Sequence, residues 1–214
     1  MAKVVSMISG GIDSPVSSYL MMKKGFEVIF AHFHSFPIVS KSSIYKTMQL
    51  VKALSEYQSP STLYLIPLGG IQIHLRTRVD PRYLVILYRR FMLRISEEIA
   101  RKEGAEAIVT GESLGQVSSQ TLQNLRVIDE ATSIPIIRPL IGFDKQEIMD
   151  LAKHIGTYEI SIKPQEDCCT LFVPRRQATA AKLEIIRDME RKLPIEKLVK
   201  DSLKKMEKVV IAGS

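Results

Sequence analysis

A glycine-containing loop between an apolar strand and a helix is the feature that most constrains the fold of this chain. The apolar run at residues 4–8 predicts a buried strand, and residues 16–24 predict a helix. Between them, Gly10 and Gly11 lack a Cβ, which permits positive φ and lets a phosphate approach the backbone N–H groups. This order of strand, loop and helix predicts a phosphate site at the start of the helix.

The residues that open this helix add polar groups to the expected site. Ser14 suits the N-cap position and Pro15 the first helical position, where a missing N–H costs nothing. The hydroxyls of Ser9 and Ser14 add donors. Asp13 would repel a phosphate unless a divalent cation lay between them, and Mg²⁺ takes oxygen ligands of this kind. We therefore expect Asp13 to be a Mg²⁺ ligand.

The loop differs from a Walker A loop, which requires G-x-x-x-x-G-K-[ST], because it contains no lysine. Its residues, Ser9-Gly10-Gly11-Ile12-Asp13-Ser14, resemble the PP-loop of ATP pyrophosphatases. These enzymes use ATP to adenylate a carbonyl oxygen and release pyrophosphate. An ordinary turn between a strand and a helix, with an Asp-Ser cap, is the alternative interpretation.

Length and composition set the class of protein. The 214 residues, 45% of them hydrophobic, suffice for one domain with a small appendage. No apolar stretch is long enough to span a membrane, and no signal-peptide pattern follows Met1, so we expect a cytoplasmic protein without a membrane partner. The net charge of +7 favours an anionic partner such as a nucleotide or nucleic acid, although a basic surface that serves solubility explains it equally well.

Four further strands are expected after the first one, alternating with helices. Their ranges are 26–33, 62–67, 105–110 and 134–140. Such alternation predicts a doubly wound, five-stranded parallel sheet of the α/β class, with the first strand in its centre. We expect this domain to cover residues 1–174 and a helical C-terminal extension, residues 175–214, to pack on it.

Several candidate site residues follow the expected strands. His32 to His34 end the second strand, where a nucleotide base could lie, and Gly111 follows the fourth. A helix is expected from Pro81 to Lys102, on which Arg89 and Arg90 could face the nucleotide or an RNA, or form a solvated surface. Asp144 and Glu147 form a capping box, and Lys145 beside them is placed to balance phosphate charge.

Five segments, in the same order, resemble the PP-loop domain of tRNA 4-thiouridine synthetase, a tRNA sulfurtransferase family also linked to thiamine biosynthesis. The resemblance spans about four-fifths of the chain, and the block from Gly111 to Leu122 is its most diagnostic part. The matching segments are Ser9–Ser14, His32–Ser35, Thr110–Leu122, Arg138–Ile141 with Asp144 and Lys145, and Glu166–Cys168.

The resemblance implies the adenine-nucleotide α-hydrolase-like (PP-loop) fold and an enzyme that binds ATP and Mg²⁺. It would adenylate O4 of a tRNA uridine, and a persulfide sulfur would then displace AMP to give 4-thiouridine. The residues that the motifs assign to ATP are Met7, Ile8, Ser9, Gly10, Gly11, Ser14, His32, Phe33, Arg89, Gly111 and Gln120. Asp13 matches the PP-loop acid, and Lys145 matches a basic residue that stabilises charge on the leaving pyrophosphate.

The two cysteines, Cys168 and Cys169, are adjacent, so they cannot staple distant parts of the fold and are too few for a closed metal site. They are either reactive thiols or small buried residues. By its position in the motif, Cys168 matches the cysteine that receives or resolves the persulfide. Cys169 in that role, or a vicinal disulfide between the two, remains an alternative.

The family's N-terminal ferredoxin-like and THUMP parts, and the rhodanese domain of some members, have no counterpart in this sequence. The expected partners are therefore tRNA, held by a separate THUMP-type protein or weakly by the chain's own basic surface, and a sulfur donor. That donor would be a cysteine desulfurase persulfide, a free persulfide or sulfide, and a homodimer is a further expected assembly. An excised domain, or a stand-alone paralogue with another substrate, would also explain the missing parts.

Two other functions fit parts of the sequence. A PP-loop ligase or amidotransferase-type synthetase acting on a small substrate explains the loop but gives Cys168 no role. A non-catalytic ATP-binding module leaves Asp13 and Lys145 without a purpose.

Overall fold

A six-stranded sheet forms the centre of the protein in the computed structural model, which describes residues 1–113, 120–164 and 168–213. The order of the strands is β5-β4-β1-β2-β3-β6. The strands are β1 Lys3–Met7, β2 Glu27–His34, β3 Ser61–Pro67, β4 Ala107–Val109, β5 Ile136–Ile137 and β6 Glu207–Ile211. Five of them are parallel, with β1 between β4 and β2, which confirms the predicted doubly wound α/β fold and the central place of the first strand.

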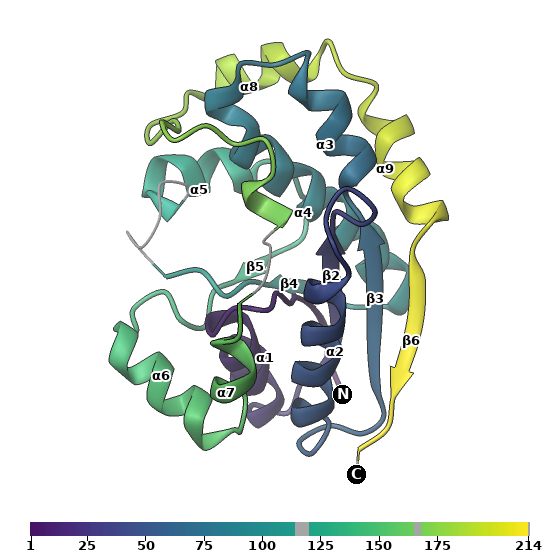
Figure 1. The fold of residues 1–214 in the computed structure, drawn as a ribbon, viewed down its shortest axis with the longest axis vertical. Helices are drawn as coiled ribbons and strands as arrows, with labels where there is room; N and C mark the ends of the chain where they lie inside the picture. Colours follow the sequence, from purple (N-terminus) through teal and green to yellow (C-terminus); the bar gives the residue numbers. More distant parts are fainter. Residues whose placement is uncertain (114–119, 165–167, 214) are drawn as a thin grey trace.

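The five predicted parallel strands are present, and β6 adds a sixth strand that was not expected. It pairs antiparallel with β3, with Val209 opposite Leu63, and runs along the edge of the sheet in Figure 1. We expected a helical tail, but α9 ends at Lys204. The β-branched residues that follow favour a strand, and the outer edge of β3 offers it a partner.

Helices cover both faces of the sheet (Figure 1). They are α1 Asp13–Lys23, α2 Ser42–Leu54, α3 Gly69–Arg76, α4 Leu84–Glu103, α5 Leu122–Asp129, α6 Lys145–His154, α7 Tyr158–Ser161, α8 Leu183–Glu190 and α9 Ile195–Lys204, with the 3₁₀ helices η1 Pro81–Tyr83 and η3 Cys168–Thr170. Neighbouring strand residues point to opposite faces, so that Val5 joins a core cluster with α3, α4, α8 and α9, while Val4 joins another with α1, α2 and α6.

Two expected elements differ in extent, and one helix was not expected. The residues after β3, to which the sequence pattern assigned no element, form α3 from Gly69 to Arg76. The helix expected from Pro81 begins with η1 and continues as α4 to Glu103, where Gly104 ends it with a φ of 69°. The fifth strand is reduced to β5. In the part of the chain that the structure describes, no helix is both long and apolar enough to cross a membrane.

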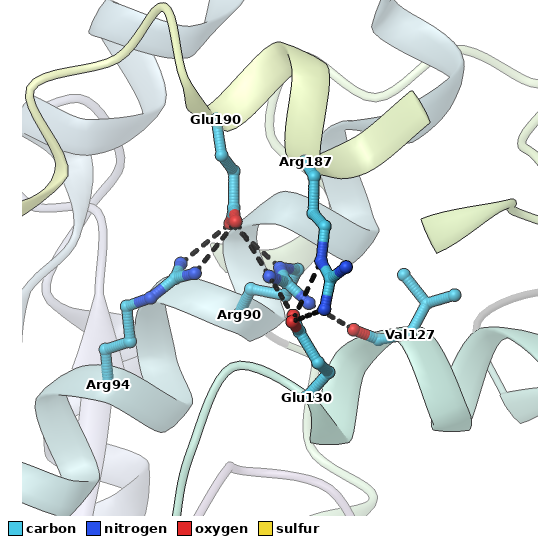
Figure 2. A network of polar contacts seen from close by, with 6 residues as sticks. All are labelled: Arg90, Arg94, Val127, Glu130, Arg187 and Glu190. Carbon is cyan, nitrogen blue, oxygen red and sulfur yellow. Dashed lines mark hydrogen bonds and ion pairs between the residues drawn. The ribbon is translucent and has the colours of Figure 1, made fainter. Parts of the chain in front are cut away.

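A buried network of charges attaches α8 to α4 and α5 (Figure 2). Arg90 of α4 is 1% exposed and donates to both carboxylate oxygens of Glu190 at 2.8 and 2.7 Å. Arg94 donates to the same two oxygens, and Arg90 also reaches Glu130, which in turn accepts from Arg187. The expectation that Arg90 faces a nucleotide, an RNA or solvent was therefore wrong, because its charge is used inside the fold.

Candidate active site at the carboxyl end of the sheet

The loop between β1 and α1 is closed by its own serines. The N–H of Ser9 donates to Oγ of Ser14 at 2.8 Å, and that hydroxyl donates to the carbonyl of Ser9 at 3.2 Å. The N–H of Gly11 reaches Oγ of Ser9 at 3.3 Å. The prediction of Ser14 as N-cap was wrong, because the helix begins at Asp13 and the Ser14 hydroxyl is engaged with Ser9.

The start of α1 keeps the properties that a phosphate site needs. Its N-cap residue, Ile12, makes no side-chain hydrogen bond to the helix, and the N–H groups of a first helical turn have no partner within the helix. The φ of Gly11 is not positive, although the sequence permitted this. Because Gly11 has no Cβ, a ligand can still approach the backbone at this position. The hydroxyl of Ser161 in α7 donates to the carbonyl of Gly11 at 3.2 Å, which connects the loop to α7.

Gly111, which follows β4, lies against the start of α1. A Cβ at Gly111 would stand 2.7 Å from the backbone nitrogen of Ser14 and 2.8 Å from its Cα, and neither atom can move without moving the helix. The hydroxyl of Ser17 donates to the carbonyl of Thr110 at 3.0 Å and holds the two segments together. In the structure, Gly111 therefore contacts the start of α1, directly after the loop at residues 9–12.

We expect Gly111→Ala to lower the stability by about 1–3 kcal/mol, the usual cost of forcing extra atoms into a close contact. It should also weaken ATP binding, because the start of α1 must shift. Urea denaturation and ATP titration check both effects. Gly142→Ala is the control, since its Cβ would have no atom within 4 Å. If both variants behaved like the wild type, the close contact would have no importance.

His32 of β2 is held neutral and buried beside the loop. Its Nδ1 donates to the carbonyl of Ile8 at 3.0 Å and lies 3.2 Å from Oγ1 of Thr47. Burial lowers the pKa of His32 to about 4. With the proton on Nδ1, Nε2 is an acceptor, and it has no partner among the described residues. Phe33 beside it is buried.

We expect the stability of the protein to fall by about 3 kcal/mol as the pH is lowered from 6.5 to 4, from His32 alone. In this interval the unfolded chain binds a proton at His32 and the folded protein does not, so acid favours unfolding. Urea denaturation at several pH values measures the slope. His32→Gln, which does not titrate, should flatten this part of the curve, and an unchanged slope would contradict the assignment.

Gln120 also carries an acceptor without a partner. It is 9% exposed, and its buried Oε1 has no hydrogen-bond partner within the described part of the chain. An unsatisfied buried acceptor is costly unless a ligand or water donates to it. The amino group of adenine is a donor of the required kind, so the acceptors of His32 and Gln120 both fit a nucleotide. Residues 114–119 of the same diagnostic block lie outside the described residues.

Arg89 belongs to a charge cluster beside β1. Glu112, which is 2% exposed, forms ion pairs with Arg89 and Arg138 and accepts from the hydroxyl of Thr110. Burial works against its charge, but the two guanidinium groups hold the pKa of Glu112 below its usual value. With Met7, these side chains line a small pocket at the carboxyl end of β1 and β4. The sequence did not single out Glu112, although it follows directly after Gly111.

Asp13 and Lys145 are the first residues of α1 and α6. The capping box of Asp144 and Glu147 is confirmed, and it places Lys145 as the first residue of α6. Burial raises the pKa of Asp13, while the charge of Lys145 acts in the opposite direction. No group of three metal-ligating side chains occurs among the described residues.

Cys168 lies in η3, on the face of the sheet that α3 and α4 cover. Its side chain is half-buried against that core cluster, and its carbonyl accepts from Nε2 of Gln72 at 2.6 Å. The Cys169 side chain and residues 165–167, including Glu166 and Asp167 of the motif, lie outside the described part.

Comparison with known proteins identifies relatives over almost the whole chain. A family model described as thiamine biosynthesis protein (ThiI) matches residues 1–195. The chain is 49% identical to a probable tRNA sulfurtransferase of Thermus thermophilus, over 96% of this chain and 50% of that protein. It is 47% identical to the corresponding protein of Moorella thermoacetica, over 94% of this chain and 52% of that one. The chain therefore spans about half the length of these curated relatives.

Solved structures agree with this assignment. The crystal structure of a 4-thiouridine synthetase–RNA complex with bound ATP matches with a TM-score of 0.93 and 41% identity, over 98% of this chain and 55% of that chain. NMN synthetase from Francisella tularensis matches with a TM-score of 0.58 and 13% identity, over 95% of this chain and 84% of that one, and shares the fold alone. The phosphate loop, the neighbouring glycine and the family match together lead to one conclusion: the chain belongs to the ThiI family of thiamine biosynthesis proteins.

Proposed function

We propose that this chain is an ATP-dependent tRNA sulfurtransferase unit that converts a uridine to 4-thiouridine. The observation that carries the proposal is the uncapped start of α1, with Asp13 and Lys145 beside it and Gly111 pressed against it. This arrangement suits a triphosphate whose terminal part leaves as pyrophosphate. The 41% identical 4-thiouridine synthetase, which was solved with RNA and ATP, supports the same function.

The proposed first step is adenylation. O4 of the uridine attacks the α-phosphorus of ATP, a new O–P bond forms, and the bond to the β-phosphate breaks to release pyrophosphate. The N–H groups of the α1 start bind phosphate oxygens, and Lys145 stabilises the charge on the leaving group. A Mg²⁺ ion, when bound, would neutralise phosphate charge, and Asp13 is the residue that would hold it.

The proposed second step transfers sulfur. The terminal sulfur of a persulfide forms a bond to C4 of the uridine, and AMP leaves with the former O4. A second thiol then cleaves the remaining S–S bond, which releases the thiouridine and leaves a disulfide that an external dithiol reduces. We assign the persulfide or the resolving thiol to Cys168, with Cys169 as the alternative.

The adenosine end of the site is assigned to β2 and its neighbours. His32, Phe33 and Gln120 would contact the base, with the Nε2 and Oε1 acceptors facing donor groups of the ligand. Met7 and Ile8 would contribute backbone groups. Arg89, held by Glu112, would approach the nucleotide from α4.

We further propose the partners and the organisation of the chain. The net charge of +7 suits tRNA, with a THUMP-type region supplied elsewhere, and a cysteine desulfurase persulfide or sulfide as the sulfur source. Residues 1–174 would form the catalytic unit and 175–214 an extension that braces it. A cytoplasmic location and a homodimer complete the proposal.

One set of assays tests this function. The chain is incubated with ATP, Mg²⁺, sulfide and unmodified tRNA, and pyrophosphate release and the near-ultraviolet absorbance of the RNA are measured. We expect pyrophosphate release that depends on RNA, together with new absorbance from thiouridine. Release that needs neither RNA nor sulfur would favour a ligase or amidotransferase-type synthetase, and ATP binding without release would favour a binding module.

A further inference from the structure

We propose that Gln72 is a positioning residue that fixes the Cys168 turn beside the nucleotide site. This inference rests on the proposed sulfur transfer and adds to it the element that places the sulfur. It concerns Gln72 of α3 and Ser35, the residue that follows β2.

Gln72 joins two segments that are far apart in the sequence. It is 0% exposed, and its Oε1 accepts from the hydroxyl of Ser35 at 2.6 Å. Its Nε2 donates to the carbonyl of Cys168 at 2.6 Å. Both ends of the amide are therefore used, and two successive hydrogen bonds lead from the end of β2 to the cysteine.

Ser35 lies directly after β2, so its hydrogen bond connects Gln72 to the end of that strand. Ser35 is also fully buried and comes directly after the strand that carries His32 and Phe33, the residues assigned to adenosine. A parallel strand delivers its carboxyl end to the ligand edge of the sheet. The Cys168 backbone is thus tied to the same edge that holds the nucleotide.

The neighbouring residues of the turn are also anchored, but to other partners. The hydroxyl of Tyr88 on α4 donates to the carbonyl of Leu171 at 3.1 Å. The Arg76 guanidinium lies 4.6 Å from the centre of the Phe172 ring, and Phe172 has a φ of 64°. The Gln72 amide bonds to Cys168 itself, whereas the contacts of Tyr88 and Arg76 given above are with Leu171 and Phe172 at the end of the turn.

A buried amide in an apolar cluster has a cost that an apolar side chain would avoid. Ile71 and Leu75 on the same helix belong to the core cluster of α3 and α4. The free-energy cost of removing the Gln72 amide from water is offset only when both of its hydrogen bonds form. The two bonds therefore contribute little net stability, and their main effect is to fix the position of the Cys168 backbone. Fixed placement of a reacting group is worth orders of magnitude in rate, and a displacement of about 1 Å can cost about 100-fold.

The test compares three variants of the full chain. Gln72→Met keeps the length of the side chain and removes both hydrogen bonds, and Ser35→Ala removes only the connection to β2. Tyr88→Phe is the matched control, because it removes the neighbouring anchor on Leu171. Each protein is loaded with sulfane sulfur from polysulfide, and thiouridine formation from the loaded protein is measured beside formation from free sulfide and beside pyrophosphate release.

We expect Gln72→Met to slow sulfur transfer from the loaded protein by about 10-fold or more, with pyrophosphate release and the sulfide reaction changed less than about 2-fold. Ser35→Ala should show a smaller loss of the same kind, and Tyr88→Phe little change. A parallel loss of all three reactions, or no loss in any, would overturn the inference and leave Gln72 with a structural role.

A second measurement does not depend on the proposed reaction. In a Cys169→Ser background, the rate at which iodoacetamide alkylates Cys168 reports how firmly the turn is held. We expect Gln72→Met to raise this rate about 5-fold or more at an unchanged melting temperature, and Tyr88→Phe to raise it less. Equal rates would refute the positioning role. A wild-type chain without thiouridine or pyrophosphate production would instead refute the proposed function, and the alkylation result would stand separately.

Discussion

An Asp13→Asn variant is expected to release pyrophosphate about 100-fold or more slowly than the wild type while it still binds ATP. Asparagine keeps the shape of the side chain, but it removes the negative charge at the start of α1. Losing one preorganised electrostatic contact to the reacting groups commonly costs 10²–10³ in rate. Pyrophosphate release under saturating ATP, with a separate ATP titration, measures the two effects.

The control for this change is Asp188→Asn, which removes one negative charge from an exposed part of α8. It should leave pyrophosphate release unchanged within about 2-fold. Full turnover by Asp13→Asn would remove the role that we assign to this residue. A variant that no longer binds ATP would show that Asp13 acts in binding and not in the reaction.

Replacing Glu190 by alanine is expected to lower the free energy of unfolding by about 3–5 kcal/mol, the range found when one partner of a buried ion pair is removed. Glu190 is 7% exposed and accepts from both Arg90 and Arg94 (Figure 2). Without it, the guanidinium of Arg90 remains buried, and within the described ranges it keeps Glu130 and the carbonyl of Val127 as partners. Urea denaturation measures the loss.

Asp188→Ala on the same helix is the matched control for Glu190→Ala. Its partner Arg191 is exposed, as Asp188 itself is, and such pairs contribute about 0–1 kcal/mol. We also expect the double variant Arg90→Met with Glu190→Leu to be more stable than Glu190→Ala, because the buried charge of Arg90 is then removed together with that of its partner. Equal stabilities of Glu190→Ala and Asp188→Ala would show that the network contributes little.

The sequence predicted correctly those elements that depend on contacts between residues close together in the chain. The strand, loop and helix at residues 4–24, and the capping box at Asp144, depend on neighbouring residues and were found correctly in type. The position of Ser14 was misjudged for a physical reason. A serine near a helix start either caps the helix or bonds to the preceding loop, and the sequence does not distinguish these two uses.

The roles of three residues could not be predicted from the sequence, because they depend on contacts with residues far away in the chain. Arg90 resembled its neighbour Arg89 in the sequence, yet its partner Glu190 is 100 residues away and makes it part of the core. Gln72 lay in a segment with no clear pattern, and its partner Cys168 is 96 residues away. The role of Glu112 could not be predicted from its neighbours in the sequence, because it depends on ion pairs with two arginines elsewhere in the chain.

The antiparallel pairing of β6 with β3 has a consequence for the order in which the protein is made. The strands β1 to β5 precede it in the chain, and the five-stranded parallel sheet can assemble while residues 207–211 are still inside the ribosome. Until they emerge, the outer backbone groups of β3 are unpaired and can join a strand of another nascent chain. Once β6 has paired, it covers this side of β3 and becomes the edge strand of the sheet itself.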